Sequence, residues 1–132
     1  MQVVDNGCGI PAAEVPLAFS RHATSKLASA EELYTVRTLG FRGEALASIG
    51  AVSRLSLATR ARGEELGTLI RMEGGLLGQP EAQGRPFGTS VEVENLFFNT
   101  PARLKFLRAD TTESGHIARL ASSYALAYPE IR

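Results

Sequence analysis

The spacing of apolar and polar residues predicts short strands and helices along most of the chain. Residues 2–4 are typical of the end of a buried strand, because an apolar run is stopped there by the turn sequence Asp5-Asn6-Gly7. Apolar residues then alternate with polar ones in three later segments, which predicts strands over residues 53–59, 66–72 and 89–93. Turn residues at 74–75 and 83–86 separate these strands.

Helices are predicted between the strands and at the end of the chain, where proline, glycine and capping residues mark their ends. A short helix is expected over residues 11–19, with Pro16 tolerable only in its first turn, and another over 43–49, with Gly50 at its end. Residues 101–107 and a helix capped by Thr112 and ending at Tyr128 follow. The last helix has an apolar face made of Ile117, Leu120, Ala121, Tyr124 and Tyr128.

The order of these elements predicts an α+β fold over one domain, residues 1–132. Residues 20–32 are polar and lack a sustained apolar period, so a loop is expected there, with a short helical turn at 31–36. The remaining order is strand, helix, loop, helix, several strands and two helices. This order predicts a two-layer α/β sandwich, in which helices cover one face of a mostly antiparallel sheet.

Composition narrows the class of protein without identifying it. Hydrophobic residues make up 44% and charged residues 21% of the chain, an ordinary globular balance. Lys plus Arg and Asp plus Glu both number 14, so bulk charge does not indicate a strongly basic nucleic-acid protein. The single cysteine cannot form an internal disulfide, which favours a reducing compartment. No apolar run approaches the roughly 18 residues of a membrane span, and no secretory signal is recognisable.

The first candidate site is the sequence Asp5-Asn6-Gly7-Cys8-Gly9, directly after the first strand. A carboxylate at a strand end can accept a hydrogen bond from an exocyclic amine, such as that of adenine. Glycines at two positions let the backbone approach a flat ring without a Cβ clash. The competing interpretation is an ordinary tight turn, since Asp-Asn-Gly is strong turn chemistry.

The second candidate site is the glycine-rich segment before the helix at 43–49. A helix N-terminus with free backbone N–H groups attracts anions, and glycines let such amides converge on a phosphate. The segment has no Gly-Lys-Ser or Gly-Lys-Thr, so it is not a Walker loop. A glycine-rich helix cap with an exposed arginine is an equally good interpretation. The residues concerned are Gly40, Phe41, Arg42, Gly43 and Glu44.

The polar segment between these two sites could also contact phosphate. Thr24, Ser25 and Lys26 offer two hydroxyls and an ammonium, although an exposed polar loop is the alternative. No cluster of ligands with metal-binding spacing surrounds His22 or His116. Cys8 has no neighbouring histidine and carboxylate that would make it a nucleophile.

Two further segments in the second half of the chain offer chemistry. The Thr89 hydroxyl, at a strand start, could share the adenine contact with Asp5, directly or through water, or could simply begin a strand. A basic edge for a phosphate backbone, or a solvated helix face, is offered by Arg103, Lys105 and Arg108. The phenylalanines of this segment are expected in the core rather than stacked on bases, namely Phe97, Phe98 and Phe106.

The order of these motifs is more specific than any one of them. DNGCGI, RHATSKL, TLGFRGEALASIG, GTSVEV and LFFNTPARLKFL occur in this order, and together they cover nearly the whole chain. This succession resembles the MutL family of DNA mismatch-repair proteins, in the GHKL-type ATPase superfamily that also contains DNA gyrase, heat-shock chaperones and histidine kinases. The superfamily shares only the glycine motifs, whereas the connecting loop and the LFFNTPARLKF stretch are similar to MutL proteins alone.

The resemblance implies a role for each matching residue. It implies that Asp5 binds adenine with support from Thr89, and that Gly7 and Gly9 line the base. Residues 20–39 correspond to a lid that closes over ATP, with Thr24, Ser25 and Lys26 near the nucleotide. The segment whose backbone would hold the phosphates is Gly40, Phe41, Arg42, Gly43 and Glu44.

The resemblance also implies a larger cycle and larger partners. In such proteins ATP closes the lid and dimerises the N-terminal regions into a DNA clamp, which couples a MutS-type mismatch sensor to strand removal until slow hydrolysis reopens it. The implied dimer is a homodimer in bacteria, and the location is cytoplasmic at the nucleoid, or nuclear in a eukaryote. No membrane partner is implied.

One departure from the family pattern bears on catalysis. The family places a helix before DNGxGI, with a glutamate that activates water and an asparagine that helps to hold Mg²⁺, and the present sequence begins after it. A fragment without its catalytic helix is therefore expected, with no general base among its own residues. The alternatives are a module that binds nucleotide without hydrolysing it, if Met1 is a true start, and a folded remnant that serves only as an interaction surface.

Overall fold

A computed structural model describes residues 1–20 and 43–130 and divides the chain into two compact units, Met1–Asn99 and Thr100–Arg132. The loop predicted over residues 20–32 and the helical turn at 31–36 lie outside the described residues, apart from Ser20 itself. Each unit is described below by itself.

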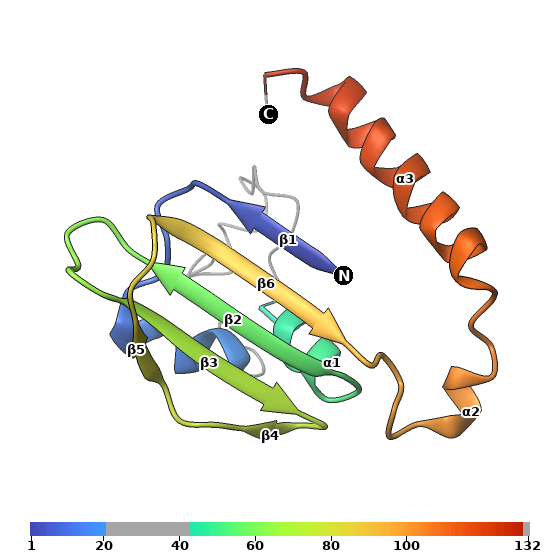
Figure 1. Cartoon of the computed structure of the whole chain (residues 1–132), viewed down its shortest axis with the longest axis horizontal. Helices are drawn as coiled ribbons and strands as arrows, with labels where there is room; N and C mark the ends of the chain where they lie inside the picture. The colour runs from blue at the N-terminus through green and yellow to red at the C-terminus, as the bar shows by residue number, and fades with distance from the viewer. Residues whose placement is uncertain (21–42, 131–132) are drawn as a thin grey trace, which may run out of the picture. The chain divides into compact units, whose positions relative to one another are not determined.

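The first unit is built on one open sheet (Figure 1). The strand order is β1-β6-β2-β3-β4, with β5 also paired to β3, and every pairing among the described strands is antiparallel. The first and last long strands of the unit in sequence, β1 and β6, are therefore neighbours. The strands are β1 (Gln2–Asp5), β2 (Arg54–Arg60), β3 (Gly67–Glu73), β4 (Leu76–Leu77), β5 (Glu81–Gln83) and β6 (Gly88–Glu94).

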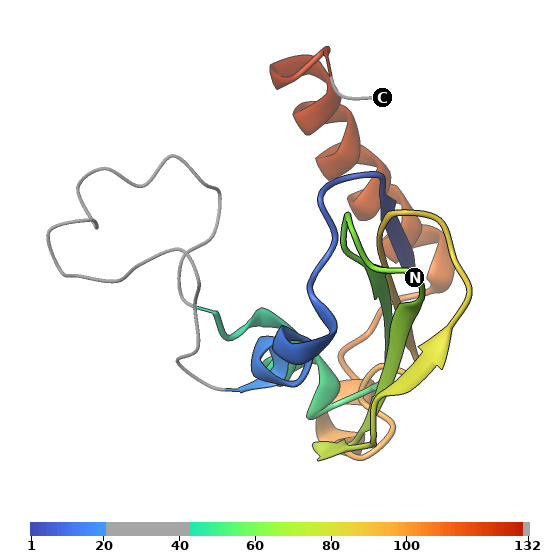
Figure 2. The same cartoon turned by 90° about the vertical axis from the view of Figure 1, so that its left-hand side faces the viewer.

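Three short helices cover one face of this sheet: η1 (Ala12–Glu14), η2 (Pro16–Phe19) and α1 (Ala45–Gly50) (Figure 2). Alternate residues of β2 and β3 point to that face, because side chains alternate along a strand. The core forms between the two layers, and it consists of the buried residues Val15, Phe19, Leu55, Leu57, Ile70 and Met72. The predicted α+β sandwich, with helices on one face of a mostly antiparallel sheet, is confirmed.

The three long strands after α1 lie within one residue of their predicted positions. Two short strands were not predicted, namely β4 and β5. They contain two and three residues, and all of these residues are exposed, so they carry too few side chains to show an alternation.

Proline changes the predicted first helix. Residues 11–19 form two 3-10 helices instead of one α-helix, because Pro16 begins η2 and cannot donate a backbone hydrogen bond within a continuing helix. Helix α1 begins at Ala45 rather than at the predicted position 43, and Glu44 is its N-cap residue. The sequence predicts a helix that extends to residue 49 with Gly50 at its end; Gly50 is its last residue and Ala51 is its C-cap.

The prediction that the first strand is buried is wrong. β1 exists, but all four of its residues are exposed, and Val3 and Val4 have 61% and 64% of their surface accessible. β1 pairs with β6 on one side only, among the described strands, so it is an edge strand. Two adjacent valines are compatible with either position in a sheet, and the sequence alone does not distinguish them.

The second unit contains α2 (Pro101–Leu104) and α3 (Asp110–Ala127). The predicted helix over 101–107 ends three residues early, and Thr112 is not the N-cap of α3, because Ala109 occupies that position. The Glu113 carboxylate instead accepts a hydrogen bond from the Arg108 backbone N–H at 3.1 Å, which secures the start of α3.

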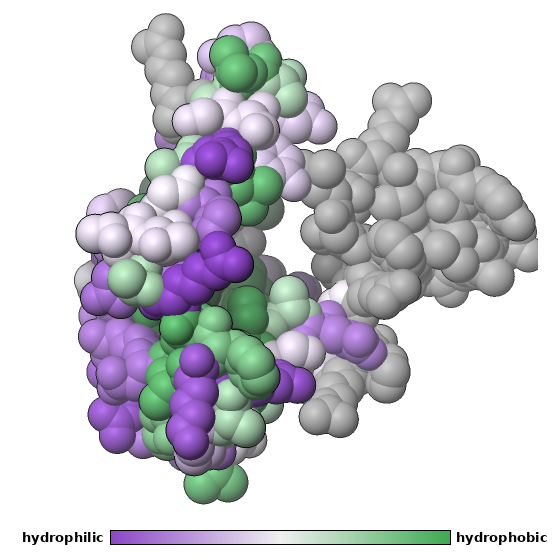
Figure 3. Space-filling view, turned by 90° about the vertical axis from the view of Figure 1, so that its right-hand side faces the viewer, coloured by the Kyte–Doolittle hydropathy of each residue, from purple (hydrophilic) through white to green (hydrophobic). Residues whose placement is uncertain are grey.

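Apolar side chains reach the surface in this part of the chain, beside polar ones (Figure 3). Ile117 is 51% and Leu120 is 61% accessible on the apolar face of α3. The core positions predicted for the phenylalanines are wrong for Phe98 and Phe106, which are 39% and 85% accessible. Phe98 belongs to the first unit, in the turn after β6, where the Arg54 guanidinium carbon lies 5.6 Å from its ring centre.

No helix in the described ranges is both long and apolar enough to cross a membrane.

Candidate functional site

Asp5 is the last residue of β1, and its carboxylate is fixed by two backbone groups. Oδ1 accepts hydrogen bonds from the N–H of Gly7 at 2.9 Å and from the N–H of Thr89 at 3.2 Å. The first bond closes the predicted turn, and the second crosses to β6, where Thr89 stands opposite Asp5. The tight turn is present, and it uses only one carboxylate oxygen, so it is compatible with the second interpretation, a ligand-binding carboxylate. Within the described part of the chain, nothing donates to Oδ2.

A buried hydroxyl lies in the same row on β2, the strand that pairs with the other edge of β6. Thr59 of β2 is fully buried and stands opposite Thr89. Its Oγ1 lies 3.0 Å from the Thr89 Oγ1 and 3.3 Å from the Gly88 carbonyl oxygen, and it accepts a hydrogen bond from the Ile10 N–H at 2.8 Å. One side chain of the sheet interior thus joins the start of β6 to the segment after Gly9.

Glycine is required at two positions around these groups, because the backbone approaches itself closely there. Gly9 has a φ of +72°, and a Cβ on it would overlap the Arg60 carbonyl oxygen. A Cβ on Gly88 would overlap the Asp5 carbonyl oxygen. Both positions bring segments distant in sequence into direct contact, so the glycines shape the rim of the site.

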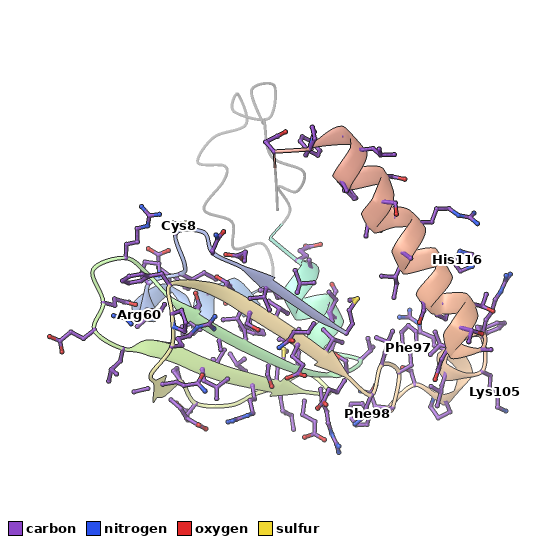
Figure 4. The ribbon with its side chains drawn as sticks, turned by 45° about the horizontal axis from the view of Figure 1, so that its top comes forward. Cys8, Arg60, Phe97, Phe98, Lys105 and His116 are labelled. Carbon is purple, nitrogen blue, oxygen red and sulfur yellow. The ribbon has the colours of Figure 1, made fainter. Side chains whose placement is uncertain are left out.

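The loop after β2 holds the segment that follows Gly9 in place. The Glu64 carboxylate accepts hydrogen bonds from the backbone N–H of Ala12 at 2.9 Å and of Ala61 at 3.4 Å. The Arg60 guanidinium donates to the carbonyl oxygens of Glu64 and Arg85, both at 2.9 Å. Its guanidinium carbon also lies 4.5 Å from the Phe87 ring centre. Figure 4 shows Cys8 and Arg60 at the same end of the sheet, opposite to Phe97 and Phe98.

The segment predicted to hold phosphates, residues 40–44, is described only from Gly43 onward. Gly43 and Glu44 are partly buried and immediately precede α1, whose Leu46 packs on the same core as Ile10. The described structure brings Asp5, Gly7, Gly9 and Thr89 together, and it places Gly43 and Glu44 on a separate element. The other predicted site residues lie outside the described residues, namely Thr24, Ser25, Lys26, Gly40, Phe41 and Arg42.

The described residues do not form a metal centre. No group of three His, Cys, Asp or Glu side chains lies close enough to hold an ion in the described ranges. A magnesium site is therefore not assigned to these residues, and no chemical step is derived through one.

Two contributors to the site were missed in the sequence, Thr59 and Glu64. Thr59 carries a recognisable signal, because it follows Leu55 and Leu57 at a spacing of two and is thus a polar residue on an apolar strand face. Glu64 carries no such signal, since its role depends on how a loop folds back onto residue 12.

The same fold occurs in solved ATPase domains. The MutL ATPase domain of Aquifex aeolicus, complexed with ADP, matches with a TM-score of 0.72 and 35% identity, over 98% of this chain and 44% of that one. The ATPase domain of the mismatch repair endonuclease MutL from the same organism matches with a TM-score of 0.68 and 34% identity, over 98% and 42%. The fold is therefore that of a GHKL-type ATPase domain.

Sequence relatives identify the family within that class. The DNA mismatch repair protein MutL of Acidobacterium capsulatum is 52% identical over 98% of this chain, and that of Xanthomonas campestris is 55% identical over 99%. MutL of Geobacter sulfurreducens is 51% identical over the whole chain. No protein-family model matches. The chain spans about a fifth of the length of these curated relatives. Over the length that it spans, the chain belongs to the MutL family.

Proposed function

We propose that this chain binds ATP and recognises its adenine through Asp5. The observation that carries the proposal is the geometry of the Asp5 carboxylate, which two backbone N–H groups hold through Oδ1. A carboxylate held in this way offers Oδ2 as an oriented acceptor for the exocyclic amine of adenine. The ADP complex of the related Aquifex domain supports a nucleotide as the ligand.

The acceptor also gives a reason for choosing adenine over guanine. Adenine presents an amine at its six position, whereas guanine presents a carbonyl oxygen, which would face the Asp5 carboxylate and be repelled. Gly7 and Gly9 would line the base. The phosphates would lie against the segment that ends with Gly43 and Glu44, with the remaining predicted contacts supplied by Thr24, Ser25, Lys26, Gly40, Phe41 and Arg42.

The role of the full-length protein is proposed on the MutL relatives. ATP binding would close a lid over the nucleotide and dimerise the N-terminal regions, as a homodimer, into a clamp around DNA. The clamp would link a MutS-type mismatch sensor to strand removal. Residues 1–132 would form part of one nucleotide-binding domain, and the bacterial relatives support the cytoplasm as its location. Hydrolysis with Mg²⁺ is not assigned to the described residues.

Asp5→Asn tests the adenine assignment. The asparagine amide oxygen can still accept from Gly7 and Thr89, so the melting temperature should remain close to that of the parent. The amide nitrogen replaces the Oδ2 acceptor by a donor, which removes a charge-assisted hydrogen bond. We expect ATP affinity, measured by calorimetry, to fall about 10- to 100-fold.

The matched control is Glu92→Gln, which removes one negative charge from an exposed position of β6. Glu92 pairs with Gln2, three residues from Asp5 along β1, and therefore on the opposite face of the sheet. Its ATP affinity should equal that of the parent. A parent without measurable ATP affinity, or an Asp5→Asn variant with unchanged affinity, overturns the assignment.

A further inference from the structure

The buried Thr59 hydroxyl occupies a position that its role in packing does not explain. Asp5, Thr89 and Thr59 form one row across β1, β6 and β2, and all three lie on the face of the sheet that carries the core. Thr68 continues the row on β3 and is also buried. Among the described residues, no hydrogen bond is made by the Thr68 side chain, whereas Thr59 has three polar neighbours.

The three neighbours decide to which group the Thr59 hydroxyl donates its proton. Its oxygen accepts from the Ile10 N–H, and its single proton can go either to the Gly88 carbonyl oxygen or to Thr89. Only one arrangement satisfies all three contacts: Thr59 donates to Gly88, and the Thr89 hydroxyl donates to Thr59. In that arrangement, the proton of Thr89 is engaged and its oxygen can only accept from a ligand.

We propose that Thr59 is a positioning residue that makes Thr89 an obligatory acceptor and thereby sets the base selectivity of the site. The proposal rests on the proposed ATP binding. With Thr89 turned in this way, the site presents two acceptors side by side, the Asp5 Oδ2 and the Thr89 Oγ1. An amine has two N–H groups and suits this pair, directly or through water, whereas the carbonyl oxygen of a 6-oxopurine does not.

The Thr59 hydroxyl also holds the segment after Gly9 against the sheet. The Ile10 N–H is partly buried, and it donates at 2.8 Å to Thr59. Loss of this acceptor would leave a backbone donor without its partner and loosen the segment that begins with Gly9. Thr59 thus acts on two parts of the candidate site, the Thr89 hydroxyl and the Ile10 N–H.

Thr59→Val removes the hydroxyl while keeping the shape of the side chain, and Thr59→Ser keeps the hydroxyl. Thr68→Val is the matched control, because it makes the same change at the next position of the row. The measurement is the calorimetric affinity for ATP and for ITP, whose base carries a carbonyl in place of the amine. Thr59→Val should narrow the preference for ATP over ITP by about fivefold, the equivalent of one hydrogen bond. The other two variants should keep the preference of the parent.

If Thr59→Val only disturbed the packing, the affinities for ATP and for ITP would fall equally and their ratio would not change. That result would overturn the proposal. A parent that binds ATP with a clear preference while Thr59→Val retains that preference refutes only the role of Thr59. A parent that binds neither nucleotide refutes the proposed function itself.

Amide hydrogen exchange of Ile10 without nucleotide provides a readout that does not depend on binding. Ile10 should be protected in the parent, in Thr59→Ser and in Thr68→Val, and at least about fivefold less protected in Thr59→Val. An unprotected Ile10 in the parent would overturn the proposal even if Thr59→Val did not fold. Equal protection of Ile10 in the parent and in Thr59→Val would overturn it as well.

Discussion

Replacement of Gly9 by alanine is the sharpest test of how the chain closes around the site. The substitution has two costs, which arise from separate features of the structure. The first is conformational, because φ is +72° at Gly9, in a region where a residue with a Cβ is strained by roughly 1–3 kcal/mol. The second is steric, because the new Cβ overlaps the carbonyl group of Arg60, which belongs to the backbone and cannot rotate away.

Gly63→Ala separates the two costs. Gly63 has a φ of +94°, but a Cβ there would meet nothing within 4 Å, so only the conformational cost applies. We expect Gly63→Ala to lose about 1–3 kcal/mol of unfolding free energy and Gly9→Ala to lose clearly more, at least ~3 kcal/mol. Relief of the overlap in Gly9→Ala would also strain the bond from the Arg62 N–H to the Cys8 carbonyl oxygen, 3.3 Å long.

The assay is urea unfolding followed by circular dichroism, with the slope of the transition checked for each variant. A loss of ~3 kcal/mol is a large part of the 5–15 kcal/mol that stabilises a typical domain, so the shift in midpoint is easily measured. If Gly9→Ala were no less stable than Gly63→Ala, then residues 7–10 would not lie against the end of β2, and the described rim of the site would be wrong.

Two further substitutions test the core and the loop that supports the site. Leu57→Ala, at a fully buried position, should lower the unfolding free energy by about 2–5 kcal/mol, whereas Leu76→Ala, at a position with 81% of its surface accessible, should change it by less than about 0.5 kcal/mol in the same denaturation experiment. Glu64→Ala should cost about 1 kcal/mol, since two backbone N–H groups lose their acceptor, while a thermal melt of Glu65→Ala, an exposed neighbour, should match that of the parent. A Glu65 variant as unstable as the Glu64 variant would contradict the role given to these hydrogen bonds.

The long strands could be predicted from sequence because their apolar residues alternate over seven positions, as Leu55 and Leu57 do in β2. The exposure of β1 could not, since Val3 and Val4 are compatible with a central or an edge strand, and only the pairing decides between them. The break in the first predicted helix at Pro16 follows from proline chemistry. That a second 3-10 helix begins there depends on the contacts of Val15 and Phe19 with the core.

The exposed residues of the candidate site could be predicted from sequence, but the buried residue that positions them could not. Asp5 and Thr89 could be chosen because a carboxylate and a hydroxyl at strand ends suggest ligand chemistry. That they are partners required the register of β1 on β6. Thr59 is fully buried, so its importance emerges only from the hydrogen bonds that join it to Ile10 and Thr89.

The pairing of β1 with β6 also has a consequence for how the protein folds. Asp5 and Thr89 are 84 positions apart, whereas β2 and β3 are joined by a short loop. Contacts between distant segments form late, because a long loop must be closed before any of them is gained. During synthesis, β1 leaves the ribosome before the other described strands and must wait until nearly all of the sheet has followed. The candidate site at Asp5 and Thr89 is therefore completed last, and a ligand that binds only the finished fold would draw the final pairing toward completion.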